Sequence, residues 1–133
     1  PILGLYLRSV ALRPENVRQA LENTIHDDRQ VTPEVVDAYF ERLRVEGATR
    51  AYFGLTAPYE NPPAPVVFRE ITMPTLAIWG QDDPLISAEI GLHASQELGD
   101  LRSFVVLPDT GHAPHEERPR AVAGLIREFL GGL

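Results

Sequence analysis

The sequence predicts an α/β fold in which two parallel strands are flanked by helices and preceded by a helical segment. Two apolar runs, residues 75–79 and 104–107, have the length of strands, and a helix-length stretch separates them. Before a cluster of prolines the chain shows helical periodicity only, whereas strand and helix patterns alternate after it. We therefore divide the chain into a helical segment (1–57), a Pro-rich linker (58–70) and an α/β segment (71–133).

The composition is that of an ordinary globular protein, with 44% hydrophobic and 23% charged residues. The net charge is −7 and the basic residues are scattered singly, which argues against a nucleic-acid or membrane-surface partner. The absence of cysteine excludes disulfides and thiolate chemistry, and no apolar run reaches the roughly 18 residues of a membrane helix. We expect a cytoplasmic protein that acts on a small molecule without a cofactor.

Three helices are expected in the first segment. Pro14 suits the first position of a helix over residues 14–26, whose apolar side chains recur at helical spacing. A second helix begins at Thr32-Pro33, a capping side chain followed by proline, and stops near Gly47. A third, short helix covers residues 48–55. Four aromatic residues on these helices either line a substrate pocket or, as we favour, pack the helices together: Tyr39, Phe40, Tyr52 and Phe53.

The α/β segment alternates strand and helix in order along the chain. The continuous apolar run 75–79, closed by Gly80, predicts a strand buried on both faces. Ser87 can cap a helix that continues through Leu98 and stops at Gly99, and the next strand covers residues 104–107. Pro119 opens the last helix, whose apolar stripe comprises Val122, Leu125, Ile126, Phe129 and Leu130.

An aspartate and a histidine follow the two predicted strands. Asp83 is the third residue after Gly80, and His112 follows the second strand. The carboxyl ends of parallel strands meet at one edge of a sheet, so these side chains can meet in one cleft. A carboxylate that accepts the ring N–H of histidine fixes its tautomer, and the histidine then acts as a general base. We predict these two catalytic roles; Asp82 competes for the acid's place, and the alternatives are a turn aspartate and a structural loop histidine.

The other histidines do not predict a metal site. Zinc-binding histidines of the metalloprotease type lie one helical turn apart on a helix, whereas Pro114 separates His112 from His115. We expect His115 and Glu116 to fix the loop and the start of the last helix. His26 and His93 lie on predicted helices, and we interpret them as surface or packing residues.

Two segments resemble the C-terminal half of α/β-hydrolase fold enzymes, the group of epoxide hydrolases, haloalkane dehalogenases and carbon–carbon bond hydrolases. They are Ile71-Thr-Met-Pro-Thr-Leu-Ala-Ile-Trp-Gly-Gln-Asp-Asp83 and Leu107-Pro-Asp-Thr-Gly-His112 with the residues up to Pro119. The resemblance implies that the strands are the last two of the hydrolase core and that residues 1–57 resemble, more loosely, its helical cap. It also implies hydrolysis of an ester, epoxide, haloalkane or C–C bond by a nucleophile–His–Asp triad, in which the acid precedes the histidine.

The third member of such a triad has no counterpart in the sequence. No two glycines stand four residues apart, so the G-x-S-x-G turn that carries a nucleophile is missing. We expect the chain to be the C-terminal part of a larger enzyme, inactive alone, whose Ser or Asp nucleophile lies upstream. The alternative is a non-catalytic interaction module that pairs through an exposed strand edge, which a homo-oligomer would also cover.

Overall fold

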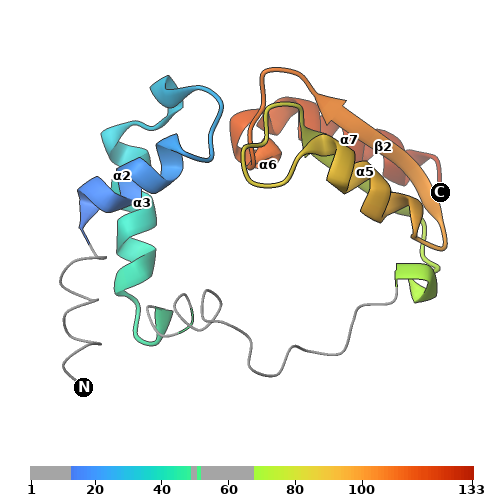
Figure 1. The fold of residues 1–133 in the computed structure, drawn as a ribbon, viewed down its shortest axis with the longest axis horizontal. Helices are drawn as coiled ribbons and strands as arrows, with labels where there is room; N and C mark the ends of the chain where they lie inside the picture. Colours follow the sequence, from blue (N-terminus) through green and yellow to red (C-terminus); the bar gives the residue numbers. More distant parts are fainter. Residues whose placement is uncertain (1–12, 49–50, 52–67) are drawn as a thin grey trace. The chain divides into compact units, whose positions relative to one another are not determined.

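The computed structural model describes residues 13–48, 51 and 68–133, which form two compact units (Figure 1). The first unit contains helices α2 (Pro14–Glu22) and α3 (Pro33–Arg44). The second contains Asn23–Asp28 together with every element from the 3₁₀ turn η2 (Phe68–Glu70) to the last helix. The segment between α2 and α3 therefore belongs in part to the second unit. The 3₁₀ turn η1 (Asp28–Gln30) spans the point at which the chain passes from the second unit back to the first.

Helices α2 and α3 contact one another and bury a small apolar core made of Val17, Leu21, Val31 and Val36. The start of α3 is as predicted: the Thr32 side chain accepts the Val35 N–H at 3.4 Å, and Pro33 occupies the first turn. Arg18 donates to the Val31 carbonyl at 2.7 Å and so ties α2 to the segment before α3. Within residues 13–48 and 51 only helical structure and its connections are found.

The first predicted helix is shorter than its periodicity suggested, because α2 ends at Glu22 and not at residue 26. A helix through residue 26 would need the His26 N–H on the carbonyl of Glu22, but this N–H donates to Oε2 of Glu117 at 2.9 Å. Ile25 is buried and belongs to the second unit. A long-range contact thus overrides the local helical preference here.

The predicted third helix lies largely outside the described residues, as do Tyr52, Phe53 and most of the Pro-rich linker. Ala48 and Ala51 are helical. Tyr39 and Phe40 are half-buried, and each carries an arginine over its ring: Arg42 at 5.4 Å and Arg44 at 6.0 Å from the respective centroids.

The second unit has a two-stranded parallel sheet of β1 (Thr75–Gly80) and β2 (Leu101–Leu107), with α5 (Ala88–Gln96) crossing between them. Leu76 pairs with Ser103 and Gly80 with Leu107, after one irregularity at the start of β1. The Ser87 side chain caps α5 as predicted by accepting the Ile90 N–H at 3.4 Å. In Figure 1, α5 lies along β2. A short helix that the sequence did not predict, α6 (Pro114–Glu117), precedes α7 (Pro119–Gly131).

The strands have the apolar pattern of a doubly buried sheet, but within the described part of the chain they are not buried on both faces. Residues 75–79 are all half-buried, and Val106 is 40% exposed. Only Val122 of the predicted α7 stripe is buried, and Leu130 is 61% exposed. A sheet of two strands contacted by α5, α6 and α7 offers too little surface to enclose every apolar side chain. Within the described ranges no helix has the length and apolarity needed to cross a bilayer.

Candidate active site

The loops that follow β1 and β2 are joined through their backbones. The N–H groups of Gln81 and Asp82 donate to the carbonyls of Leu107 and Thr110, each at 2.9 Å. A Cβ at Gly80 would overlap the carbonyl oxygens of Thr110 and Gly111, so only glycine permits this approach. The second loop turns at Asp109, whose φ of 48° is left-handed. The two strand ends are thereby brought close together.

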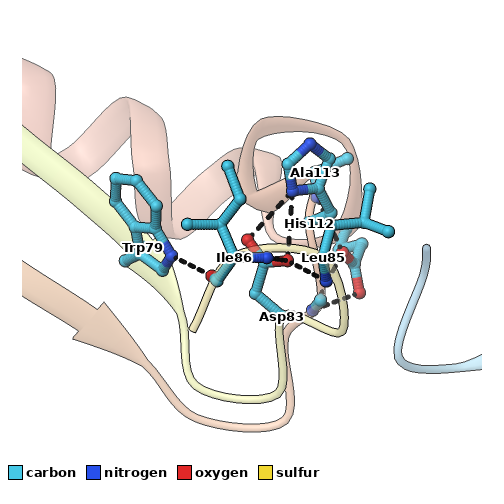
Figure 2. A network of polar contacts seen from close by, with 8 residues as sticks. Trp79, Asp83, Leu85, Ile86, His112 and Ala113 are labelled. Atoms are coloured by element: carbon cyan, nitrogen blue, oxygen red, sulfur yellow. Dashed lines mark hydrogen bonds and ion pairs between the residues drawn. The ribbon is translucent and has the colours of Figure 1, made fainter. Parts of the chain in front are cut away.

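Asp83 lies in the first loop with its carboxylate almost fully enclosed, because only 4% of its side chain is exposed. Its Oδ1 accepts the N–H groups of Leu85 at 2.9 Å and Ile86 at 3.0 Å. The Ile86 carbonyl in turn accepts the indole N–H of Trp79 at 2.8 Å. This local chain of hydrogen bonds fixes the direction in which the Asp83 carboxylate points (Figure 2).

The structure brings His112 against Asp83, as expected from their places after the two strands. The ring Nδ1 lies 2.9 Å from Oδ2 and 3.1 Å from Oδ1 of Asp83. The rest of the ring is directed away from the carboxylate, and 41% of the His112 side chain is exposed (Figure 2). The pair therefore consists of an enclosed carboxylate and an imidazole whose far nitrogen is accessible.

The charge state of Asp83 sets the tautomer of His112. Burial raises the pKa of the Asp83 carboxyl, but hydrogen bonds from Ile86, His112 and Leu85, together with the charge of a protonated His112, outweigh burial and hold the pKa below its ordinary value. An ionised carboxylate can only accept hydrogen bonds, so the Nδ1 of His112 must carry the proton. A neutral ring then keeps its lone pair on Nε2, where it can accept a proton.

Asp82 does not compete for His112. Its carboxylate lies 3.3 Å from the Nδ1 of His26. The expectation that His26 lies on a helix is wrong, because His26 lies beyond the end of α2, beside the loop of Asp82; its side chain is exposed, in agreement with a surface residue. His93 is exposed on α5, in agreement with a surface role.

Sequence reasoning missed the residue that holds the His112 loop. Glu117, on the unpredicted α6, is only 6% exposed and accepts backbone N–H groups from Gly111, Ala113 and His26. We expected His115 and Glu116 to fix this loop; both are exposed, and the amides of Gly111 and Ala113 donate to Glu117. The one available signal was a proline that can open a helix, with a carboxylate three residues further on.

The described residues also contain a groove and a group of possible metal ligands. A groove of about 420 Å³ lies between α2 and α3, but it contains neither Asp83 nor His112. His26, Asp82 and Asp109 place three possible metal ligands within 4.8 Å of one another. All three are exposed, and exposed acidic groups often gather without an ion, so we assign no metal to them.

A model of the alpha/beta hydrolase family matches residues 2–125, nearly the whole chain. The chain belongs to the alpha/beta hydrolase family. It is 31% identical over 134 residues to the uncharacterized hydrolase YugF of Bacillus subtilis, covering 98% of this chain and 47% of that protein. A 2-hydroxy-6-oxononadienedioate/2-hydroxy-6-oxononatrienedioate hydrolase of a Pseudomonas species is 27% identical over 118 residues, covering 87% of this chain and 41% of that protein.

A similar solved structure is that of a serine hydrolase of carbazole degradation, CarC, with a TM-score of 0.79 and 17% identity. The match covers 92% of this chain and 48% of that one. At this identity the likeness shows the fold, which agrees with the α/β-hydrolase architecture expected from the two resembling segments. The chain spans about half the length of the relatives it matches.

Proposed function

We propose that this chain carries the acid and the base of a hydrolase that works by a nucleophile–His–Asp triad, with Asp83 as the acid and His112 as the base. The observation that carries the proposal is the contact of 2.9 Å between the enclosed Asp83 carboxylate and Nδ1 of His112. This contact leaves Nε2 as the basic nitrogen of an accessible ring. Membership of a family of hydrolases agrees with this chemistry.

In the proposed reaction, Nε2 of His112 takes a proton from the attacking hydroxyl group, which is a serine side chain or a water molecule. The ring becomes an imidazolium, and the Asp83 carboxylate stabilises its positive charge. Nε2 then returns the proton to a leaving group that needs one; a halide leaves as the anion, and the imidazolium then gives its proton to water. Asp83 stays ionised throughout, in agreement with its lowered pKa.

The nucleophile belongs, in this proposal, to sequence outside this chain. Among the described serines, Ser87 accepts the Ile90 N–H as the cap of α5, Ser95 is 6% exposed, and Ser103 lies within β2. None of them follows a strand and opens a helix between closely spaced glycines, as a nucleophile turn requires. The chain alone would then lack both the attacking group and the oxyanion hole.

The proposed substrate is a small organic molecule with an ester, epoxide, haloalkane or C–C bond to hydrolyse. Two relatives agree with part of this range: the 2-hydroxy-6-oxononadienedioate/2-hydroxy-6-oxononatrienedioate hydrolase named above, and epoxide hydrolase 3 of Xenopus tropicalis, which is 29% identical over 66 residues and of which the match covers 18%. We further propose that residues 1–57, with α2 and α3, form part of the cap of this enzyme, and that it acts in the cytoplasm. The absence of β-structure within residues 13–48 and 51 agrees with a helical cap.

The test uses the full-length polypeptide that contains this chain and a panel of chromogenic esters, epoxides and haloalkanes. His112→Ala should lower turnover by about 10³-fold or more. His93→Ala removes an exposed histidine of the same unit and serves as the control with unchanged turnover. If His112→Ala keeps the turnover of the control, the triad is wrong. If the unmodified polypeptide turns over no substrate of the panel, the alternative of a non-catalytic module that pairs through a strand edge is favoured.

A further inference from the structure

Glu117 holds the backbone on both sides of His112. Its Oε1 accepts the N–H groups of Gly111 at 3.0 Å and Ala113 at 3.2 Å. Its Oε2 accepts the Gly111 N–H at 2.9 Å and the His26 N–H at 2.9 Å. The N–H of His112 itself donates to the Thr24 carbonyl at 2.8 Å. Three successive amides of the loop are therefore held by partners outside it.

The same contacts bind the loop to the segment 23–28. A Cβ at Gly111 would overlap the Thr24 carbonyl and lie 2.8 Å from the His26 nitrogen, so loop and segment are in direct backbone contact. Glu117 is 6% exposed and sits where these backbones meet. Replacing a buried carboxylate that accepts hydrogen bonds from several backbone amides lowers stability. Each amide left without an acceptor has lost its hydrogen bonds to water and forms none in the protein.

We propose that Glu117 is a positioning residue for His112: by holding the amides of Gly111, Ala113 and His26, it sets the His112 ring at its distance from Asp83. The hydrogen bonds of Glu117 described above all go to backbone amides, so its effect on the ring passes through the backbone. The catalytic consequence rests on the proposed function of His112. Small displacements of a general base lower turnover strongly, because proton transfer requires a correct distance.

The distinguishing variant is Glu117→Gln, which keeps the size of the side chain and removes one acceptor. Each carboxylate oxygen now serves two donors, and a glutamine has only one oxygen. If the glutamine NH₂ takes the place of Oε2, this donor faces the N–H donors of Gly111 and His26. In the other orientation it faces the N–H donors of Gly111 and Ala113. Neither orientation satisfies the loop. The matched control is Glu116→Gln, the same change one residue earlier at an exposed position.

Two readouts separate this role from a general loss of stability, and both use the full-length polypeptide. The first is the Nδ1 proton of His112, followed by NMR with ¹⁵N-labelled histidine. In Glu117→Gln its exchange with solvent should rise by about 10-fold or more, while Glu116→Gln leaves it unchanged. The second is turnover, where kcat should fall by about 10-fold or more with KM changed less than about 2-fold. A folded Glu117→Gln that matches Glu116→Gln in both readouts would overturn the proposal.

The readouts also distinguish failure of this inference from failure of the proposed function. If His112→Ala leaves turnover intact while Glu117→Gln still accelerates exchange of the Nδ1 proton, Glu117 positions the ring but the ring is not the base. If Glu117→Gln does not fold, hydrogen exchange of the backbone amides in the unmodified protein tests whether Glu117 holds the loop. The Gly111 and Ala113 amides should then be protected to within about 10-fold of the amides of β2, and exchange at the rate of an open loop would refute the role of Glu117.

Discussion

The substitution Asp83→Asn tests the tautomer of His112 directly. Oδ1 of Asp83 accepts two backbone N–H groups, from Leu85 and Ile86, so the asparagine oxygen should take this position. The asparagine NH₂ then occupies the place of Oδ2, 2.9 Å from Nδ1 of His112. A donor at this position favours a lone pair on Nδ1 and moves the proton to Nε2. The ring keeps its place but loses its basic nitrogen.

The expected loss is large in activity and small in stability. In a serine protease with the same pair of groups, the same change lowers kcat about 10⁴-fold by selecting the wrong tautomer. We expect a fall of about 10³- to 10⁴-fold in the full-length polypeptide, equivalent to about 4 to 5.5 kcal/mol of activation free energy. The free energy of unfolding should fall by only about 1 kcal/mol, because both loop amides keep a neutral acceptor.

Turnover of a chromogenic substrate measures the first effect, and ¹⁵N NMR of the histidine ring identifies which nitrogen carries the proton. Asp82→Asn is the control, since its carboxylate faces His26 and not His112. It should leave both turnover and the His112 tautomer unchanged. A folded Asp83→Asn variant that retains turnover within about 10-fold, or that keeps the proton on Nδ1, would refute the reasoning.

Three further predictions follow from single contacts. A Cβ at Gly91 would lie 2.6 Å from the Trp79 indole, so Gly91→Ala should lower the free energy of unfolding by about 1 to 2 kcal/mol, although alanine has the better helix propensity. Gly124→Ala, with open space around the new Cβ, should raise the free energy of unfolding by about 0.5 to 1 kcal/mol. Urea unfolding measures both changes, and equal effects of the two substitutions would contradict the packing around Gly91. Because the pKa of Asp83 is lowered in the folded state, its contribution to stability is complete above the ordinary value of 3.8 and is lost as the pH falls through the lower folded value. The free energy of unfolding, measured between pH 6 and 2, should therefore fall with acid by less in Asp83→Asn than in the unmodified protein. Identical pH curves for the two proteins would contradict this contribution of Asp83. The 133-residue chain alone should hydrolyse no chromogenic ester faster than its own His112→Ala variant, and turnover lost on this substitution would reveal a nucleophile that we have not recognised.

The elements of the second unit could be predicted because their signals are local. Continuous apolar runs marked β1 and the second half of β2, whose first residues, 101–103, include a charged and a polar side chain and were not predicted, and Ser87 marked the start of α5. The meeting of Asp83 and His112 followed from topology alone, since both lie just beyond the carboxyl ends of parallel strands.

What could not be predicted depends on contacts between distant parts of the chain. The separation between His26 and Glu117 is 91 residues, and no periodicity reports a contact over that distance. For the same reason the early end of α2 was missed, because the N–H of His26 donates to Glu117 and not to the helix. The half-buried state of the strands depends on what else covers the sheet, which a strand's own residues do not reveal.

The position of Trp79 makes its fluorescence a reporter of the loop that carries Asp83. It is the only tryptophan in the sequence, and its indole donates to the carbonyl of Ile86, the residue whose own amide holds Asp83. On its other side the ring stacks with Phe104, at 6.1 Å between centroids. Indole emission depends on the polarity around the ring and on its hydrogen bond. A shift in the fluorescence of this chain would therefore register a movement of the loop that carries Asp83, without any label.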